Sequence, residues 1–136
     1  MASASKSQGY VTTYWEDPVG IDVNKVNDGI SYLYNGSCVT YGYYEKWHLY
    51  WYSPSGWGKN ADNFRSARQC SLEAASSYAL FENDVFCFPN SCFAEYNRTS
   101  IHGHADGTLY GFWKPDCHGD SRCGLLSWHA QLIRQI

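Results

Sequence analysis

Alternating aromatic and polar side chains are most concentrated in residues 38–58, CVTYGYYEKWHLYWYSPSGWG, and we interpret this stretch as the centre of the fold. It is predicted to form two strands, 38–44 and 47–52, separated by a weak break. Successive side chains of a strand point to opposite faces, so the odd-numbered residues of 47–52 should share one face and the even-numbered residues the other. We expect one face to be core and the other to present amphipathic rings to water or to a partner.

The exposed rings of this stretch are the predicted binding residues. They are Tyr50, Tyr52, Trp57, Tyr41 and Tyr43. Such rings can stack on sugars or dock against another protein, and they can also simply stabilise a sheet through cross-strand pairs. Trp57 lies on the Pro- and Gly-rich loop 53–59, where the alternative is that it folds back over the edge of the core.

Further β-type runs lie on both sides of this stretch. The predicted strands are 10–15, 21–26, 30–34, 85–87, 92–96, 98–102, 108–113 and 125–136, the last with a helix as the alternative. Asn27-Asp28-Gly29 is predicted to be a turn. Asn35-Gly36 is the strongest hairpin signal, because both central residues of a type I′ turn need a positive φ.

Residues 60–80 are the one stretch with a helical pattern. Five side chains recur there at helical spacing: Phe64, Ala67, Ser71, Ala74 and Tyr78. The interior has neither Gly nor Pro, and Asn60 or Asp62 can cap the start. The predicted fold class is therefore α+β, mainly antiparallel β of sandwich or barrel-like form, with one helix near 60–80.

The six cysteines form an even set without a CxxC pair, which favours disulfides over a zinc or redox site. Every pairing is possible in principle, and local spacing favours Cys38–Cys70, Cys87–Cys92 and Cys117–Cys123. Sequons at Asn35 and Asn97 are predicted glycosylation sites. These features together predict a secreted, extracellular glycoprotein.

The length of 136 residues suits one domain, predicted over 9–136, with 1–8 as a flexible tail or an added start. A net charge of -3 with scattered basic residues argues against nucleic acid as a partner. No apolar run approaches the roughly 20 residues of a membrane span. Because the N-terminus lacks a hydrophobic signal core, we expect a mature chain from which a signal peptide has been removed.

Histidines supply the candidate chemistry. His102 and His104 would share one strand face and could form a metal pair with Asp106 or His118, although the surrounding glycines suit an ordinary polar loop. An endoribonuclease-like site would need an acid–base pair and a phosphate clamp. Candidates for it are His48, Glu95, Arg98, His102 and His104. No motif supports a catalytic nucleophile, so we assign no catalytic residue, metal or cofactor.

The even cysteine set, the Tyr-rich β pattern, the sequons and the short polar tail resemble those of small secreted cysteine-rich effectors and host-selective toxins of plant-associated fungi. This resemblance covers the whole chain at the level of composition. It implies a non-enzymatic virulence protein that binds a host extracellular protein or receptor. A carbohydrate-binding module or lectin that takes a cell-wall glycan is the first alternative, and a small secreted ribonuclease is the second.

Overall fold

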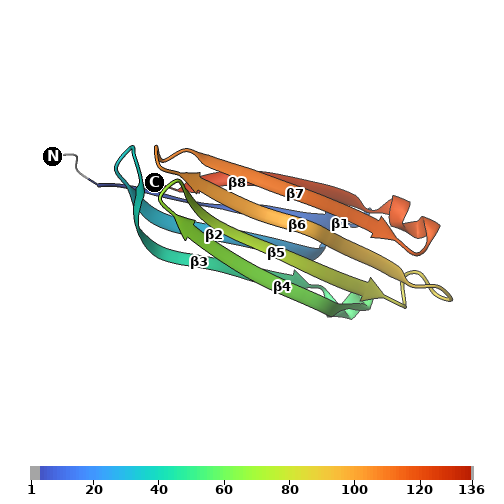
Figure 1. The fold of residues 1–136 in the computed structure, drawn as a ribbon. Coiled ribbons are helices and arrows are strands. Elements are labelled where there is room, and N and C mark those ends of the chain that lie inside the picture. Colours follow the sequence, from blue (N-terminus) through green and yellow to red (C-terminus); the bar gives the residue numbers. More distant parts are fainter. Residues whose placement is uncertain (1–3, 136) are drawn as a thin grey trace.

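The computed structural model describes residues 4–135, which form eight strands in two antiparallel sheets packed face to face (Figure 1). The strands are β1 (Ser5–Glu16), β2 (Asp22–Tyr34), β3 (Val39–Trp51), β4 (Trp57–Gln69), β5 (Leu72–Asn83), β6 (Cys92–His104), β7 (Leu109–His118) and β8 (Ser127–Gln135). The first sheet has the order β3-β2-β1-β8, and the second has the order β4-β5-β6-β7. The predicted α+β fold class is therefore wrong, because residues 4–135 form an almost entirely antiparallel β structure of two sheets.

Apolar side chains that alternate along the inner strands fill the space between the sheets. One cluster is built around Trp15, Trp57 and Phe81, and a second around Ile30 and Ile101. In the register of β1 with β2, inward Val11 faces Asp28. Asp28 is itself fully buried, and it reaches across to the buried Ser77 of the second sheet. The core therefore contains a polar contact as well as two apolar clusters.

The helix predicted at 60–80 is wrong, because these residues form most of the β4–β5 hairpin. Helical structure within residues 4–135 is limited to two short 3-10 turns, Ser53–Ser55 and Ser121–Leu125. On β5 the buried positions alternate, but Glu73, Ala75, Ser77 and Ala79 are small or polar residues. Pairing between strands therefore overrides a local pattern whose apolar signal is weak.

Two predicted interruptions are also wrong, because residues 27–29 lie inside the continuous strand β2 and the break predicted between 44 and 47 lies inside β3. The strand predicted at 85–87 is wrong as well, because these residues belong to the β5–β6 loop. In β2 the turn-type residues are tolerated because Asp28 finds a partner in the core and Gly29 lies beneath neighbouring side chains. The hairpin predicted at Asn35-Gly36 is confirmed, but its turn is not type I′, because of these two residues only Gly36 has a positive φ, of 92°.

All three predicted disulfides are present. Cys38–Cys70 joins the β2–β3 turn to the β4–β5 turn, and the N–H of Val39 donates to the carbonyl of Cys70 beside it. This bridge ties the two sheets together at one end of the molecule, opposite the end that carries the two 3-10 turns (Figure 1).

The chain ends also take part in the sheets. β8 confirms the strand predicted at the C-terminus, and it pairs with β1. β1 begins at Ser5, so residues 5–8 of the stretch expected to be a tail are strand. Residues 1–3 of that stretch lie outside the described residues.

Candidate ligand-binding site

The outward face of the first sheet carries a set of tyrosines that we call the tyrosine face. Its members are Tyr10 and Tyr14 on β1 and Tyr41, Tyr43, Tyr44 and Tyr50 on β3. The strand register places them on this face, because their neighbours Val11, Trp15 and Leu49 point inward to the core. Alternation along β1 and β3 therefore produces one aromatic surface, and the register shift in β3 that leaves Tyr43 unpaired lets the consecutive Tyr43 and Tyr44 share it.

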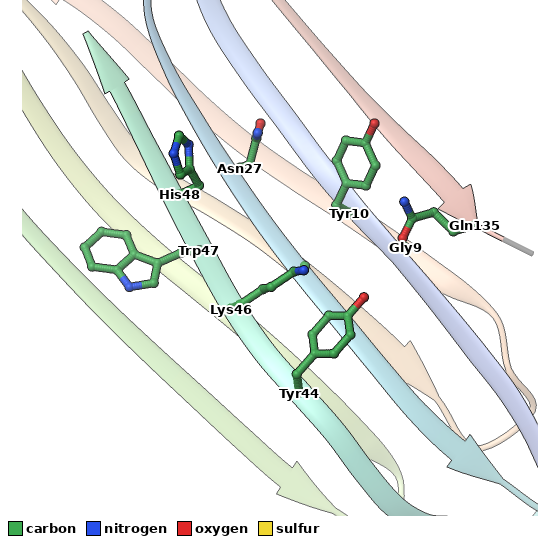
Figure 2. Close-up of a pocket in the computed structure, with 9 residues that line it drawn as sticks. Gly9, Tyr10, Asn27, Tyr44, Lys46, Trp47, His48 and Gln135 are labelled. Carbon is green, nitrogen blue, oxygen red and sulfur yellow. The ribbon is translucent and has the colours of Figure 1, made fainter.

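A hollow of about 430 Å³ lies in the middle of this face. We call it the central hollow. Its lining is Gly9, Tyr10, Asn27, Gly29, Tyr44, Lys46, Trp47, His48 and Gln135. Tyr10 and Tyr44 stand on the strands either side of β2, while the Trp47 side chain points away from the other lining residues (Figure 2).

The hollow exists because Gly29 has no side chain. In the register of the sheet, Gly29 lies directly between Tyr10 on β1 and Lys46 on β3. A Cβ atom added at Gly29 would meet Tyr10 Cβ at 3.5 Å and Lys46 Cε at 3.8 Å, which are ordinary contact distances. Gly29 thus forms the floor of the hollow, and the side chains around it form the walls.

Lysine ammonium groups lie over tyrosine rings of this face. Lys46 Nζ is 4.4 Å from the centre of the Tyr44 ring, and Lys6 Nζ is 5.0 Å from that of Tyr43. Lys25 Nζ is 5.2 Å from the ring of Tyr14. Such cation–π contacts hold the amines close to the rings, so the face presents aromatic and basic groups together.

A second aromatic hollow, of about 400 Å³, opens toward the β8 edge of the same sheet. It is lined by Tyr14, Trp113, Trp128, His129, Ala130 and Gln131. The Tyr14 and His129 rings stack with their centres 5.0 Å apart. Trp128 is 45% exposed, which makes it the most exposed tryptophan side chain in the described part of the chain.

The predicted binding residues divide into three groups. Tyr41, Tyr43 and Tyr50 are exposed on the tyrosine face, at 54%, 52% and 39% respectively. Tyr52 follows the end of β3 and is half-buried. Trp57 is only 3% exposed and belongs to the core, so the prediction that it contacts a partner is wrong and its alternative as a core cap is correct.

Sequence reasoning missed Tyr10, Tyr44, Lys46 and Gly29, which form the central hollow. One signal for the hollow is present in the sequence. Gly29 lies inside a run of strand residues, and such a glycine is typical of a bulge or of a site where a ligand or another backbone approaches closely. The sequence instead predicts a turn at this position. The cross-strand neighbours of Gly29 come from residues 19 before it and 17 after it, and only the sheet register brings them together.

His102 and His104 lie on the outward face of β6 and contact aromatic rings of β7. The ring centres of His102 and Phe112 are 4.7 Å apart, as are those of His104 and Tyr110. Burial, followed by the charges of Arg98 and His104, lowers the pKa of His102. Within residues 4–135, neither histidine belongs to a cluster of three groups close enough to hold a metal.

A different trio on the second sheet has the spacing of metal ligands. The ligand atoms of Glu95, Asp116 and His118 lie within 4.8 Å of one another, and His118 Nε2 is 3.3 Å from Glu95 Oε1. The Tyr78 hydroxyl donates to the other Glu95 oxygen, which raises the pKa of Tyr78 to about 12. These side chains are accessible to solvent and could jointly bind a divalent cation.

The endoribonuclease-like set is not brought together. Glu95, Arg98, His102 and His104 all lie on β6 of the second sheet, whereas His48 lies on β3 in the lining of the central hollow. The imidazole that contacts Glu95 is that of His118. His48 therefore has no role in a site formed by the β6 residues.

Both predicted glycosylation residues are exposed. Asn35 lies in the β2–β3 turn, where its Oδ1 accepts hydrogen bonds from the N–H groups of Ser37 and Cys38. Asn97 lies at the irregular point in the β5–β6 pairing, and its Nδ2 donates to the carbonyl of Lys114 at 3.4 Å. Both positions are thus reachable from solvent.

None of the helices in the described residues has the length and apolarity required to cross a membrane. Comparison of the chain with models of known protein families, with curated proteins and with solved structures finds no match.

Proposed function

We propose that this protein is a secreted, non-enzymatic binding protein that takes a carbohydrate chain on its tyrosine face, with one sugar ring in the central hollow. The observation that carries the proposal is the glycine floor at Gly29, which lies between Tyr10 on β1 and Lys46 on β3, with Tyr44 two residues from Lys46 in the same lining. The three disulfides are compatible with an extracellular protein.

The chemistry of the central hollow suits a sugar. Flat aromatic rings contact the C–H face of a sugar ring, and a few polar groups then fix its orientation. Asn27, His48 and Gln135 supply such groups around the two tyrosines. The hollow is shallow and lies on the broad face of a sheet, so a chain can extend beyond it in both directions.

The decisive test fills the hollow without removing any side chain that would contact the sugar. Gly29→Val places methyl groups on the floor, its Cβ meets its neighbours only at ordinary contact distances, and thermal melting checks that the fold is kept. The matched control is Gly58→Val, since a Cβ at Gly58 on β4 meets nothing within 4 Å. On a glycan array, wild type and Gly58→Val should bind the same glycans, and Gly29→Val should lose them.

Tyr44→Ala should weaken the same binding by about tenfold, because truncation of an aromatic residue that dominates a binding surface costs on the order of 1–2 kcal/mol. Equal binding by Gly29→Val and wild type would contradict the proposal. So would an array on which the wild-type protein binds no glycan.

A host protein as the partner is the second candidate, and one observation favours it. Tyr41 and Tyr43 form an edge-to-face pair, with ring centres 5.1 Å apart, on the edge strand β3. They are the most exposed tyrosines of the face, and paired exposed rings are typical anchors of protein interfaces. Capture of one host extracellular protein that is lost in Tyr41→Ala/Tyr43→Ala and kept in Gly29→Val would favour this function.

A further inference from the structure

We infer that the carbohydrate bound by the tyrosine face is a polyuronate, a chain whose sugar rings each carry one carboxylate. This inference rests on the proposed function and names the class of its ligand. It is carried by the distribution of charge on the face and by a second hollow that adjoins the first.

Basic groups dominate this face although the chain as a whole is acidic, with 13 acidic and 10 basic residues. Lys6 and Lys46 lie over tyrosine rings, and within residues 4–135 neither forms an ion pair. Lys25 is paired with Asp22 at 3.2 Å, near the β1–β2 turn. The cations on the central part of the face are therefore available to a ligand.

A hollow of about 360 Å³ continues from the central hollow. We call it the basic hollow, and its lining is Lys6, Gln8, Arg134 and Gln135. Gln135 lines both hollows, so they are direct neighbours. None of the described residues that line either hollow carries a carboxylate.

The pattern matches a ligand with spaced negative charges. Each hollow has its own amine, Lys46 in one and Lys6 in the other, beside a tyrosine or amide that can contact the sugar itself. A chain with one carboxylate per ring can occupy both hollows and place its charges near these amines. A neutral chain would leave both lysines unused, and a densely sulfated chain would demand a tighter cluster of cations than this face offers.

The experiment compares polygalacturonate with its fully methyl-esterified form, which has the same rings without the charge. Affinity electrophoresis should show strong retardation by the free acid and weak retardation by the ester. Exposed ion pairs are screened by salt, so raising the salt from about 0.05 M to about 0.5 M should reduce binding to the acid and leave binding to the ester unchanged.

Variants that remove one charge each test whether Lys6 and Lys46 cause the preference for the free acid. Lys6→Gln and Lys46→Gln should each bind polygalacturonate about three- to fivefold more weakly, which is the scale of an exposed ion pair. Lys59→Gln and Lys114→Gln, which lie on the second sheet, should bind like wild type. Thermal melting of all four should match wild type, because none of these side chains is buried.

The outcomes separate this inference from the proposed function. Equal retardation by acid and ester, with loss of both in Gly29→Val, would overturn the polyuronate and keep the carbohydrate site. Tighter binding to a sulfated polysaccharide than to polygalacturonate would also overturn it. If Gly29→Val leaves all glycan binding unchanged, both the inference and the proposed function fail.

Discussion

The Ser77 hydroxyl on β5 donates a hydrogen bond of 2.6 Å to Oδ1 of Asp28 on β2, across the space between the two sheets. Asp28 has no exposed surface, and its Oδ2 has no partner among the described residues. Burial raises the pKa of Asp28 from 3.8 to about 7, and the bond from Ser77 opposes this only in part. The centre of the core therefore contains a carboxyl group that favours its protonated form.

Because the buried Asp28 has a raised pKa, we expect the protein to be more stable in acid than at mildly alkaline pH. Its folded pKa lies above its unfolded value, so the stability linked to it is fully present below about pH 4 and is lost as pH rises through 7. The free energy of unfolding should be roughly 1–3 kcal/mol larger at pH 5 than at pH 8. Urea denaturation at the two pH values measures this difference.

Asp28→Asn should remove the part of that pH dependence that Asp28 contributes, since an amide of the same shape does not titrate. Asp116→Asn, which changes an exposed carboxylate, is the control and should keep the wild-type profile. A wild-type protein that is equally stable at pH 5 and pH 8 would contradict the assignment to Asp28.

Glu73 should make a second contribution to the pH dependence of stability, with the same sign as that of Asp28. It is fully buried, and burial, with its contact to Glu45, raises its pKa to about 7, although Arg68 Nε lies 2.8 Å from its Oε2 and opposes the shift. Stability from Glu73 is thus also lost as pH rises through 7. Glu73→Gln should flatten the profile further, and the double variant with Asp28→Asn should be nearly independent of pH between 5 and 8.

Removal of the Cys38–Cys70 bridge should cause a large loss of stability. It closes a loop with a sequence separation of 32 residues, for which chain entropy gives about 3–4 kcal/mol. Cys38→Ser/Cys70→Ser should lower the urea midpoint accordingly. The bridge Cys117–Cys123 spans 6 residues, and its removal should cost only about 2 kcal/mol. The reverse ranking would show that this entropy argument does not describe the protein.

Substitution of Trp57 should reduce the stability of the protein rather than its binding of a ligand. Because its ring packs in the cluster of Trp15 and Phe81, Trp57→Ala should destabilise the protein by about 3–5 kcal/mol. Chemical denaturation measures this loss. Trp57→Phe keeps most of the packing and serves for binding assays, where it should bind glycans like wild type. If folded Trp57→Phe loses glycan binding, Trp57 contributes to the binding site and this prediction is wrong.

We expect Trp47 and Phe64 to be energetically coupled across the neighbouring edges of the two sheets. Their rings stack with centres 5.4 Å apart and an interplanar angle of 10°, which joins β3 to β4. A double-mutant cycle with Trp47→Ala and Phe64→Ala should give a coupling energy of about 0.5–1.5 kcal/mol. Additive losses would show that the two rings contribute only through burial.

Several features followed from the sequence because they depend on neighbours in the chain. The β2–β3 hairpin follows from the turn residues of the short loop 35–38, and Cys87–Cys92 and Cys117–Cys123 close short loops. The faces of β3 also followed from alternation, since Tyr50 is exposed and Leu49 packs on the core. The β-rich character and these two short bridges were therefore predictable, whereas Cys38–Cys70, with a sequence separation of 32, depends on how the two sheets pack.

The helix was predicted at 60–80 because helical spacing was the strongest local pattern there. β4 is an edge strand whose side chains are exposed apart from Trp57, Gly58 and Phe64, so it shows no apolar alternation. β5 fills its inner positions from Glu73 to Ala79 with small and polar residues, which are buried only because the first sheet covers them, and Phe81 is a large apolar residue beyond this run. Neither fact can be known before the sheets are assembled.

The sequence by itself determined a disulfide-linked, aromatic-rich β domain, because turn chemistry, alternation and cysteine spacing act over short distances. Only the tertiary structure decided that Trp57 is core and that Gly29 is the floor of a hollow lined by Tyr10, Tyr44 and Lys46. The physical reason is the register of the sheet. Hydrogen bonds between strands fix which distant residues become neighbours, and a binding site is made of such neighbours.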